Sequence, residues 1–186
     1  LDAHILLMVR TFIAIDLPPE VTDRVPPCQE ILKRSAARLT LVDPRNIHLT
    51  LKFLGEVEES MLAPVGDALR SLRSYPFPMA LNGVAGNPPR APRVIWCNVQ
   101  DAGQCARLHD RVEEILSPLG IPRDPRAFTP HVTVARVKRF DPSLLPQVRA
   151  VAQTTFGTCT VAGFSFKKST LTPEGPLYEN ILEVRW

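Results

Sequence analysis

One short pattern occurs twice in the chain: His-x-Thr-x at residues 48–51 and again at residues 131–134. Successive side chains of a β-strand point to opposite faces, so each His shares a face with its own Thr while the apolar residues take the other face. His and Thr would then lie roughly 6–7 Å apart along the strand, close enough for one phosphate-sized anion to contact both. If the two strands are neighbours in a sheet, two imidazoles and two hydroxyls surround one small volume.

A single His-x-Thr would be weak evidence, because half-buried His and Thr side chains are ordinary in sheets. Here both copies follow a proline-containing turn, at residues 43–46 and 125–130, and both lie in an alternating apolar segment. The copies are separated by close to half of the 186 residues. This repetition predicts an internal duplication with both motif strands near a pseudo-twofold axis.

The order strand, helix, motif strand, helix, strand is predicted twice along the chain. The expected strands cover residues 9–17, 39–42, 47–54, 77–84, 94–99, 129–137, 158–171 and 178–186. The expected helices cover residues 19–38, 56–73, 102–119 and 141–153, the last with Asp141 as its N-cap. Pro26 and Pro27 interrupt the first of these helices, so a kink or a restart is expected near Cys28.

These elements indicate an α+β fold. We expect a bilobed pseudo-twofold duplication, with mainly antiparallel sheets lining a central cleft and helices outside. Residues 8–186 are predicted to form one domain with intertwined lobes, its halves being roughly 8–86 and 93–186. Residues 1–7 are interpreted as an expression remnant or an upstream extension.

Composition narrows the possible functions. A formal net charge of +3 favours anionic partners but is too small to predict tight duplex binding. No apolar run reaches the roughly 18 residues needed to cross a bilayer, so no membrane association is expected. The four cysteines show no C-x-x-C pair and are expected to be reduced thiols in the cytoplasm. No metal-binding or P-loop motif occurs, so neither a metal nor another cofactor is predicted.

Four landmarks occur in order, at residues 10–18, 46–55, 92–96 and 128–136. On these residues the chain resembles the two-histidine phosphoesterase superfamily, and within it the LigT-type RNA 2′,3′-cyclic phosphodiesterases first named 2′-5′ RNA ligases. The resemblance implies the bilobed fold and an enzyme of RNA processing that opens a terminal 2′,3′-cyclic phosphate to a 2′-phosphate. Reversible 2′-5′ joining of RNA ends is expected as a side activity. The expected partners are RNA ends or oligonucleotides with a cyclic phosphate, tRNA fragments among them, acted on by a monomer.

The motif residues suit acid and base catalysis because the unperturbed imidazole pKa lies near working pH. The resemblance implies that His48 donates a proton to the leaving 3′ oxygen and that His131 is the base for water. The residues themselves leave this direction open, since the motifs are nearly symmetric. Thr50 and Thr133 are expected to donate hydrogen bonds to the nonbridging phosphate oxygens.

Two further residues each lie five positions beyond a motif His. The resemblance suggests that Arg136 helps bind the phosphate and that Phe53 helps form the nucleotide pocket. Strict alternation would point both away from the histidine face, so a bulge or a strand end is required. By the same parity, Lys52 is interpreted either as a positive charge at the rim of the cleft or as a solvated lysine.

Aromatic residues and a third histidine complete the candidates. Trp96 and Phe12 could stack on a base, although core packing is favoured for Phe12. His109 lies in a charged helical segment and is predicted to be solvated. A module that binds RNA without turnover remains an alternative, suggested by Arg90 and Arg93. A purely structural protein would require the motif pair to be accidental.

Overall fold

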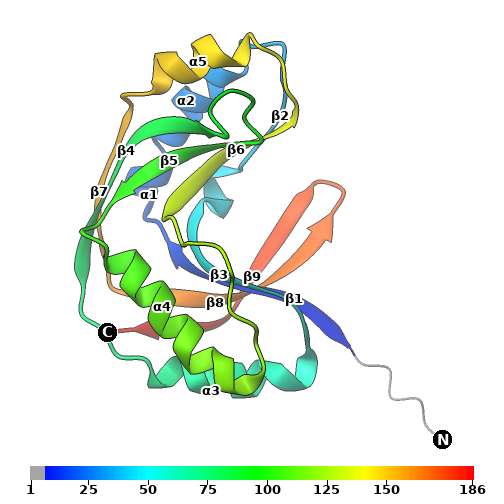
Figure 1. The fold of residues 1–186 in the computed structure, drawn as a ribbon, viewed down its shortest axis with the longest axis vertical. Helices are drawn as coiled ribbons and strands as arrows, with labels where there is room; N and C mark the ends of the chain where they lie inside the picture. Colours follow the sequence, from blue (N-terminus) through cyan, green and yellow to red (C-terminus); the bar gives the residue numbers. More distant parts are fainter. Residues whose placement is uncertain (1–6) are drawn as a thin grey trace, which may run out of the picture.

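Every strand that the computed structural model describes, over residues 7–186, belongs to one sheet of antiparallel pairs (Figure 1). The strand order is β7-β4-β5-β6-β3-β1-β8-β9, and β2 also pairs with β6. The strands are β1 (Met8–Asp16), β2 (Arg38–Leu41), β3 (His48–Glu58), β4 (Phe77–Asn87), β5 (Val94–Gln100), β6 (His131–Arg139), β7 (Thr155–Val161), β8 (Gly163–Thr172) and β9 (Gly175–Arg185). The predicted α+β, mainly antiparallel class is confirmed. Of the segment 1–7, only Leu7 is described, and the interpretation of that segment lies outside the described residues.

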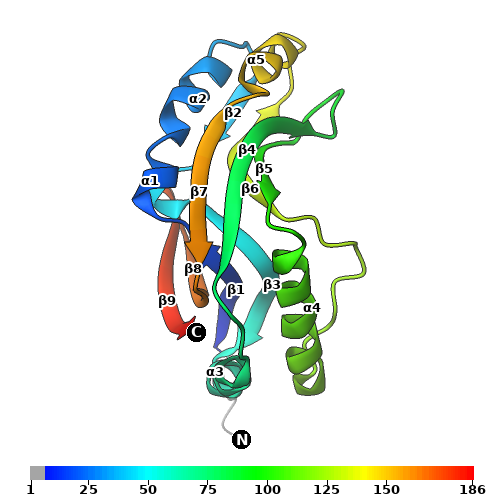
Figure 2. The ribbon, with the colours of Figure 1, turned by 90° about the vertical axis from the view of Figure 1, so that its left-hand side faces the viewer.

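Four of the helices gather in two pairs at opposite ends of the molecule, and a short one packs against β7 between them (Figure 2). The helices are α1 (Pro19–Thr22), α2 (Val25–Leu32), α3 (Leu62–Ser71), α4 (Gln104–Leu116) and α5 (Leu144–Val151). Helix α2 packs on α5 and against β6, while α3 packs on α4 and α4 packs against β3. Each half of the sequence therefore supplies the helix that covers the motif strand of the other half. This exchange supports the proposal that residues 8–186 form one domain with intertwined lobes.

The two motif strands, β3 and β6, are neighbours at the middle of the strand order. Within the described part of the chain, their ladder has one residue pair, Leu49 opposite Val132. Both side chains are buried, with Leu49 fully inaccessible to solvent. The same apolar core contains residues from both lobes, so the contact that joins the lobes is hydrophobic on one face of the sheet.

Some local boundaries agree with the sequence predictions and others differ. The expected restart near Cys28 is confirmed, because α2 begins at Val25 and accommodates both prolines in its first turn, where no intrahelical N–H is needed. The prediction of a single strand over residues 158–171 was wrong. It is divided into β7 and β8, and β8 begins at Gly163, where a side chain would collide with the Val184 carbonyl.

The predicted cap of the last helix was also wrong. Helix α5 begins at Leu144 with Ser143 at the N-cap position. The carboxylate of Asp141 instead accepts hydrogen bonds from the backbone N–H and the hydroxyl of Ser143. Asp141 therefore forms a turn before the helix, which is a common alternative for this side chain.

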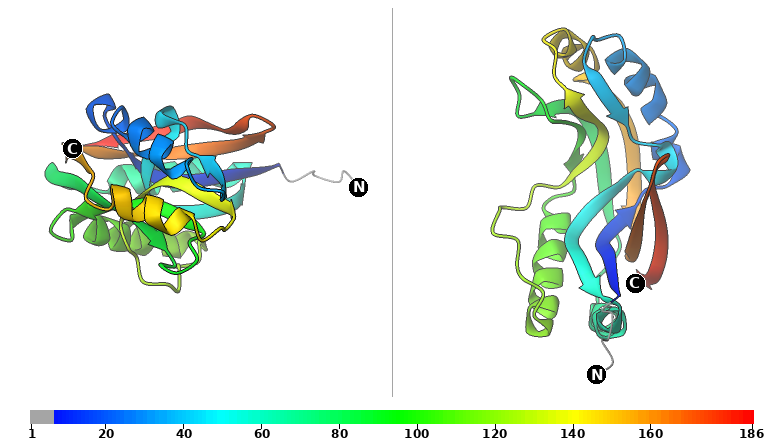
Figure 3. Two further views of the ribbon diagram at one scale, coloured as in Figure 1. Left: turned by 90° about the horizontal axis from the view of Figure 1, so that it is seen from above. Right: turned by 90° about the vertical axis from the view of Figure 1, so that its right-hand side faces the viewer.

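Strands β8 and β9 form a hairpin that extends the sheet next to β1 (Figure 3, orange and red). Leu171 and Leu177, near the turn of the hairpin, are exposed. Further from the turn, Phe164, Phe166 and Val184 are buried and belong to the core. The hairpin is thus anchored at one end and presents apolar side chains to solvent at the other.

We predict that Leu49→Ala lowers the free energy of unfolding by about 2–5 kcal/mol, the range for truncating a buried leucine. Leu171→Ala is the matched control, since its side chain is 70% exposed, and it should change stability by less than about 0.5 kcal/mol. Urea denaturation of both variants measures the difference. Equal losses would contradict the central place of the Leu49–Val132 contact.

Candidate active site

The antiparallel register of β3 and β6 places each motif histidine opposite the threonine of the other motif. From the one paired position, His48 faces Thr133 and Thr50 faces His131 across the strands. The buried residues between them point to the opposite face, so all four functional side chains lie on the same face of the sheet. The two histidines are diagonal neighbours, a relation that separates Cα atoms by about 7–8 Å. The structure therefore brings the two motifs together.

Both imidazoles are held in the same way. His48 Nδ1 lies 2.7 Å from the Asn46 carbonyl oxygen, and His131 Nδ1 lies 2.8 Å from the Thr129 carbonyl oxygen. A carbonyl only accepts hydrogen bonds, so each Nδ1 carries a proton and each Nε2 is the atom that gains or loses one. His48 Nε2 lies 3.0 Å from Thr50 Oγ1.

Aromatic rings surround the two histidines unequally. The ring of His48 lies 5.0 Å from Phe12 and 5.4 Å from Tyr178, measured between centroids. His131 contacts Trp96, with centroids 4.4 Å apart and planes tilted by 33°. Phe12 is buried, so its predicted core location is confirmed, although one of its contacts is the catalytic candidate His48.

The pKa of His48 is lowered from its ordinary value. Burial is the largest cause, and the positive charges of Lys167 and Arg136 act in the same direction. The hydrogen bond to the Asn46 carbonyl and the negative charge of Asp16 partly oppose them. In the free protein His48 is thus biased towards its neutral form, because water and neighbouring anions do not compensate its charge.

A β-bulge follows each motif. In the pairing of β1 with β3, Leu51 is the extra residue, and in the pairing of β5 with β6 it is Val134. A bulge reverses the alternation of the side chains beyond it. Phe53 therefore returns to the histidine face, where it is 59% exposed and lies 5.9 Å from Phe12. Arg136 is likewise exposed on β6, and its charge acts on His48.

Both interpretations of Lys52 were wrong, because the bulge turns this side chain into the protein. Its Nζ lies 2.8 Å from the Glu113 carboxylate on α4, and both side chains are almost fully buried. The same Nζ donates a hydrogen bond of 2.9 Å to the Pro122 carbonyl. Strand parity alone mispredicted the residue, since the sequence carries no local signal for a bulge at Leu51.

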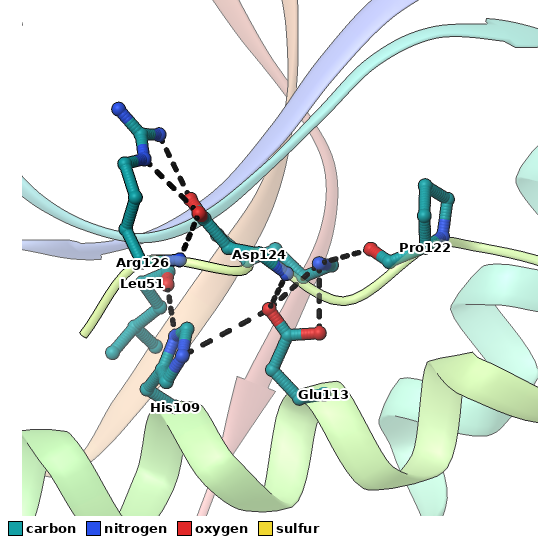
Figure 4. A network of polar contacts seen from close by, with 7 residues as sticks. Leu51, His109, Glu113, Pro122, Asp124 and Arg126 are labelled. Atoms are coloured by element: carbon teal, nitrogen blue, oxygen red, sulfur yellow. Dashed lines mark hydrogen bonds and ion pairs between the residues drawn. The ribbon is translucent and has the colours of Figure 1, made fainter. Parts of the chain in front are cut away.

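The prediction that His109 is solvated was also wrong. Its ring is buried, and Nδ1 lies 2.8 Å from the Leu51 carbonyl oxygen (Figure 4). The imidazole stacks on Phe128 with centroids 4.3 Å apart and planes nearly parallel. His109 belongs to the inner face of α4, which the charged residues around it in the sequence had obscured.

Sequence reasoning missed a polar group beside His48. Lys167 Nζ lies 2.8 Å from the carboxylate of Asp16, which also accepts a hydrogen bond of 2.6 Å from the Ser165 hydroxyl. Asn180 accepts a further hydrogen bond from Lys167. These residues come from β1, β8 and β9, so only the pairing of those strands assembles them. Asp16 lies within the first landmark, which was the one available signal.

Two possible features are absent from residues 7–186. No helix there is long and apolar enough to traverse a bilayer. No group of three or more His, Cys, Asp or Glu side chains has the arrangement of a metal site in that same part of the chain.

The chain is similar in sequence to a known protein family and to named members of one protein group. The family model of the 2′-5′ RNA ligase superfamily matches residues 18–169. An Archaeoglobus fulgidus protein named RNA 2′,3′-cyclic phosphodiesterase is 38% identical, covering 93% of this chain and 98% of its own. A protein of the same name from Aeropyrum pernix is 35% identical over 84% of this chain and 92% of its own.

Solved structures share the fold over nearly the full length. The structure of a Thermus thermophilus protein, TT0787, has a TM-score of 0.82 at 30% identity and covers 95% of this chain and 97% of its own. The structure of E. coli LigT complexed with 3′-AMP has a TM-score of 0.77 at 24% identity, covering 96% and 98%. The latter similarity establishes the fold.

Lys167→Met should raise the pKa of His48. The substitution removes a positive charge that lowers this pKa and leaves the Asp16 carboxylate without its cationic partner. An NMR titration of the histidine ring protons measures the change. Lys33→Met, which removes a lysine paired with Glu30 on the surface, is the control and should leave the His48 titration unchanged. A constant or lower pKa in Lys167→Met would contradict the electrostatic account.

Proposed function

The chain belongs to the 2′-5′ RNA ligase superfamily, and from this premise we propose that it is an RNA 2′,3′-cyclic phosphodiesterase. One observation carries the proposal: two histidines with matching Nδ1 hydrogen bonds lie beside two threonines on one face of adjacent strands. Such a pair can remove one proton and deliver another on opposite sides of a phosphorus atom. The names of the relatives point to the same hydrolase activity.

The proposed reaction needs one base and one acid. His131 Nε2 takes a proton from water as the water oxygen forms a bond to phosphorus. The bond between phosphorus and the 3′ oxygen breaks, and His48 Nε2 delivers its proton to that oxygen. The products are a 2′-phosphate and a 3′ hydroxyl. One proton has in effect moved from His48 to His131, and exchange with solvent resets both rings.

Electrostatic contacts to the phosphate complete the proposal. The hydroxyls of Thr50 and Thr133 donate to the nonbridging oxygens, and Arg136 supplies positive charge as negative charge shifts towards the leaving oxygen. Phe53 offers an exposed ring for the base of the terminal nucleotide, a contact worth about 1–3 kcal/mol where bases stack. The role of each residue is a proposal supported by its position on the histidine face.

The lowered pKa of His48 bears on its role as the acid. An acid works below its pKa, so in the free protein fewer molecules carry the required proton at neutral pH. The negative charge of the cyclic phosphate opposes burial and raises this pKa when substrate binds. His48 is thus a stronger candidate for the acid in the complex than in the free protein.

Joining an RNA 2′,3′-cyclic end to a 5′ hydroxyl uses the same groups, because the 5′ hydroxyl takes the place of water. His131 removes the hydroxyl proton as the 5′ oxygen bonds to phosphorus, and His48 protonates the departing 3′ oxygen. Reversible 2′-5′ joining is therefore proposed as a side activity, as the family description suggests. We further propose RNA ends, tRNA fragments among them, as substrates of a monomer. The four free cysteines support a reducing compartment such as the cytoplasm.

His48→Ala and His131→Ala should each lower hydrolysis of an oligonucleotide 2′,3′-cyclic phosphate by about 10²–10⁴-fold, the usual contribution of a general acid or base. The assay contains a chelator, and end-group analysis should find a 2′-phosphate. Thr158→Val, on an exposed position of β7, is the control for substitutions in the site and should keep full activity. Near-normal turnover in either histidine variant, or a 3′-phosphate product, would refute the mechanism.

The direction of proton transfer has its own test. Because Lys167→Met raises the pKa of His48, a larger fraction of the free protein carries a proton on His48 at neutral pH. The value of kcat/KM at neutral pH should therefore rise if His48 is the acid and fall if His48 is the base. A pH–rate comparison of Lys167→Met with Lys33→Met distinguishes the two assignments.

A further inference from the structure

The two bulges share a feature beyond their positions. At each one, a buried polar side chain from a helix donates a hydrogen bond to the carbonyl of the extra residue. His109 on α4 donates through Nδ1 to the Leu51 oxygen at 2.8 Å, and Gln29 on α2 donates through Nε2 to the Val134 oxygen at 2.9 Å. The donors are themselves buried, being 7% and 4% exposed.

The arrangement follows the pseudo-twofold duplication. Leu51 and Val134 are each the third residue after a motif histidine. Gln29 belongs to the first half of the sequence and reaches the motif strand of the second, while His109 belongs to the second half and reaches the motif strand of the first. Two different side chains thus donate a hydrogen bond to the bulge carbonyl at equivalent positions of the two halves. The feature that the two bulges share is this hydrogen bond, and the type of residue that donates it differs.

A bulge takes a carbonyl out of the regular ladder, and a buried carbonyl without a partner is costly. At the second bulge, the Gln29 amide also donates to the Val42 carbonyl at 2.8 Å, and the Val42 N–H donates to the same Val134 oxygen. This closes the end of β2 onto β6. The bulged backbone is therefore held by specific donors inside the core.

The first bulge is held within a larger network (Figure 4). Lys52, turned inward by the bulge, pairs with Glu113, whose carboxylate also accepts the backbone N–H of Asp124 at 3.2 Å. His109 stacks on Phe128 in the same segment. That segment leads directly to Thr129, whose carbonyl orients His131, so this cluster contacts the strand of one motif and the approach to the other.

We propose that Gln29 and His109 are positioning residues for the phosphodiesterase reaction. Gln29 acts through Arg136, and His109 acts through Phe53. Each hydrogen bond stabilises the bulge that turns Arg136 or Phe53 onto the histidine face. Without the bulge, strict alternation would direct that side chain to the opposite face. The inference rests on the proposed function, because it assigns Arg136 to the phosphate and Phe53 to the base.

A double-mutant cycle tests the action through Arg136. Gln29→Met, nearly isosteric and without a donor, should lower kcat/KM by about 10- to 100-fold, as misplacement of a contacting group does. If Gln29 acts through Arg136, the double variant Gln29→Met/Arg136→Met will be no slower than Arg136→Met alone. Arg139→Met, at an exposed arginine on the same strand, is the matched control, and its effect should simply multiply that of Gln29→Met. Multiplying effects for Gln29 with Arg136 would overturn the inference.

The second half is tested in the same way with His109 and Phe53. His109→Leu should lower kcat/KM and add nothing to Phe53→Ala, whereas His109→Asn, whose amide keeps a donor near the Nδ1 position, should restore most of the activity. Independent multiplication of the His109→Leu and Phe53→Ala defects, or failure of His109→Asn to exceed His109→Leu, would overturn the assignment.

A binding measurement tests this inference independently of the proposed function. Hydrolysis by the unmodified protein tests the function, whereas the Gln29 cycle is repeated with the affinity for inorganic phosphate measured by calorimetry, which requires no turnover. Coupling between Gln29 and Arg136 in phosphate affinity supports the inference even if no hydrolysis occurs, and its absence overturns it. If Gln29→Met does not fold, Gln29→Asn, whose shorter amide no longer reaches the bulge, replaces it in both cycles.

Discussion

The antiparallel contact between β3 and β6 is the interaction on which the site depends. Its paired residues, Leu49 and Val132, are buried on one face, and their register alone sets each motif histidine opposite the other motif's threonine. A shift by one residue would move every functional side chain to the core face. Hydrophobic packing beneath the sheet therefore specifies the geometry of the polar group above it.

The two halves of the site are symmetric in backbone and unequal in surroundings. Both histidines bind a carbonyl two residues upstream through Nδ1, and both motifs end in a bulge. Yet His48 is enclosed by Phe12 and Tyr178, with Lys167 nearby, while His131 contacts Trp96. The duplicated scaffold thus gives two identical side chains different neighbours, and those around His48 lower its pKa.

Much of the fold was predictable from periodicity and repetition, and so was the meeting of the two motifs. The errors at the site had two physical sources. Strand parity assigned Lys52 to the cleft rim and required an unexplained irregularity to bring Phe53 and Arg136 to the histidines, because a bulge leaves no reliable mark in local sequence. The prediction that His109 is solvated was wrong because its charged neighbours in the sequence lie on the outer face of α4. Whether a helical side chain is buried depends on what that face of the helix packs against.

Patterns along the chain are enough to predict the duplicated His-x-Thr strands, the alternation that puts each His beside its Thr, and the resemblance to a known family. These are properties of nearest neighbours along the chain, so they can be read without coordinates. Folding is needed to set the register between β3 and β6, to form the two bulges, and to bring the buried donors Gln29 and His109 to them. Those features depend on groups far apart in the sequence, whose contacts exist only once the core has formed.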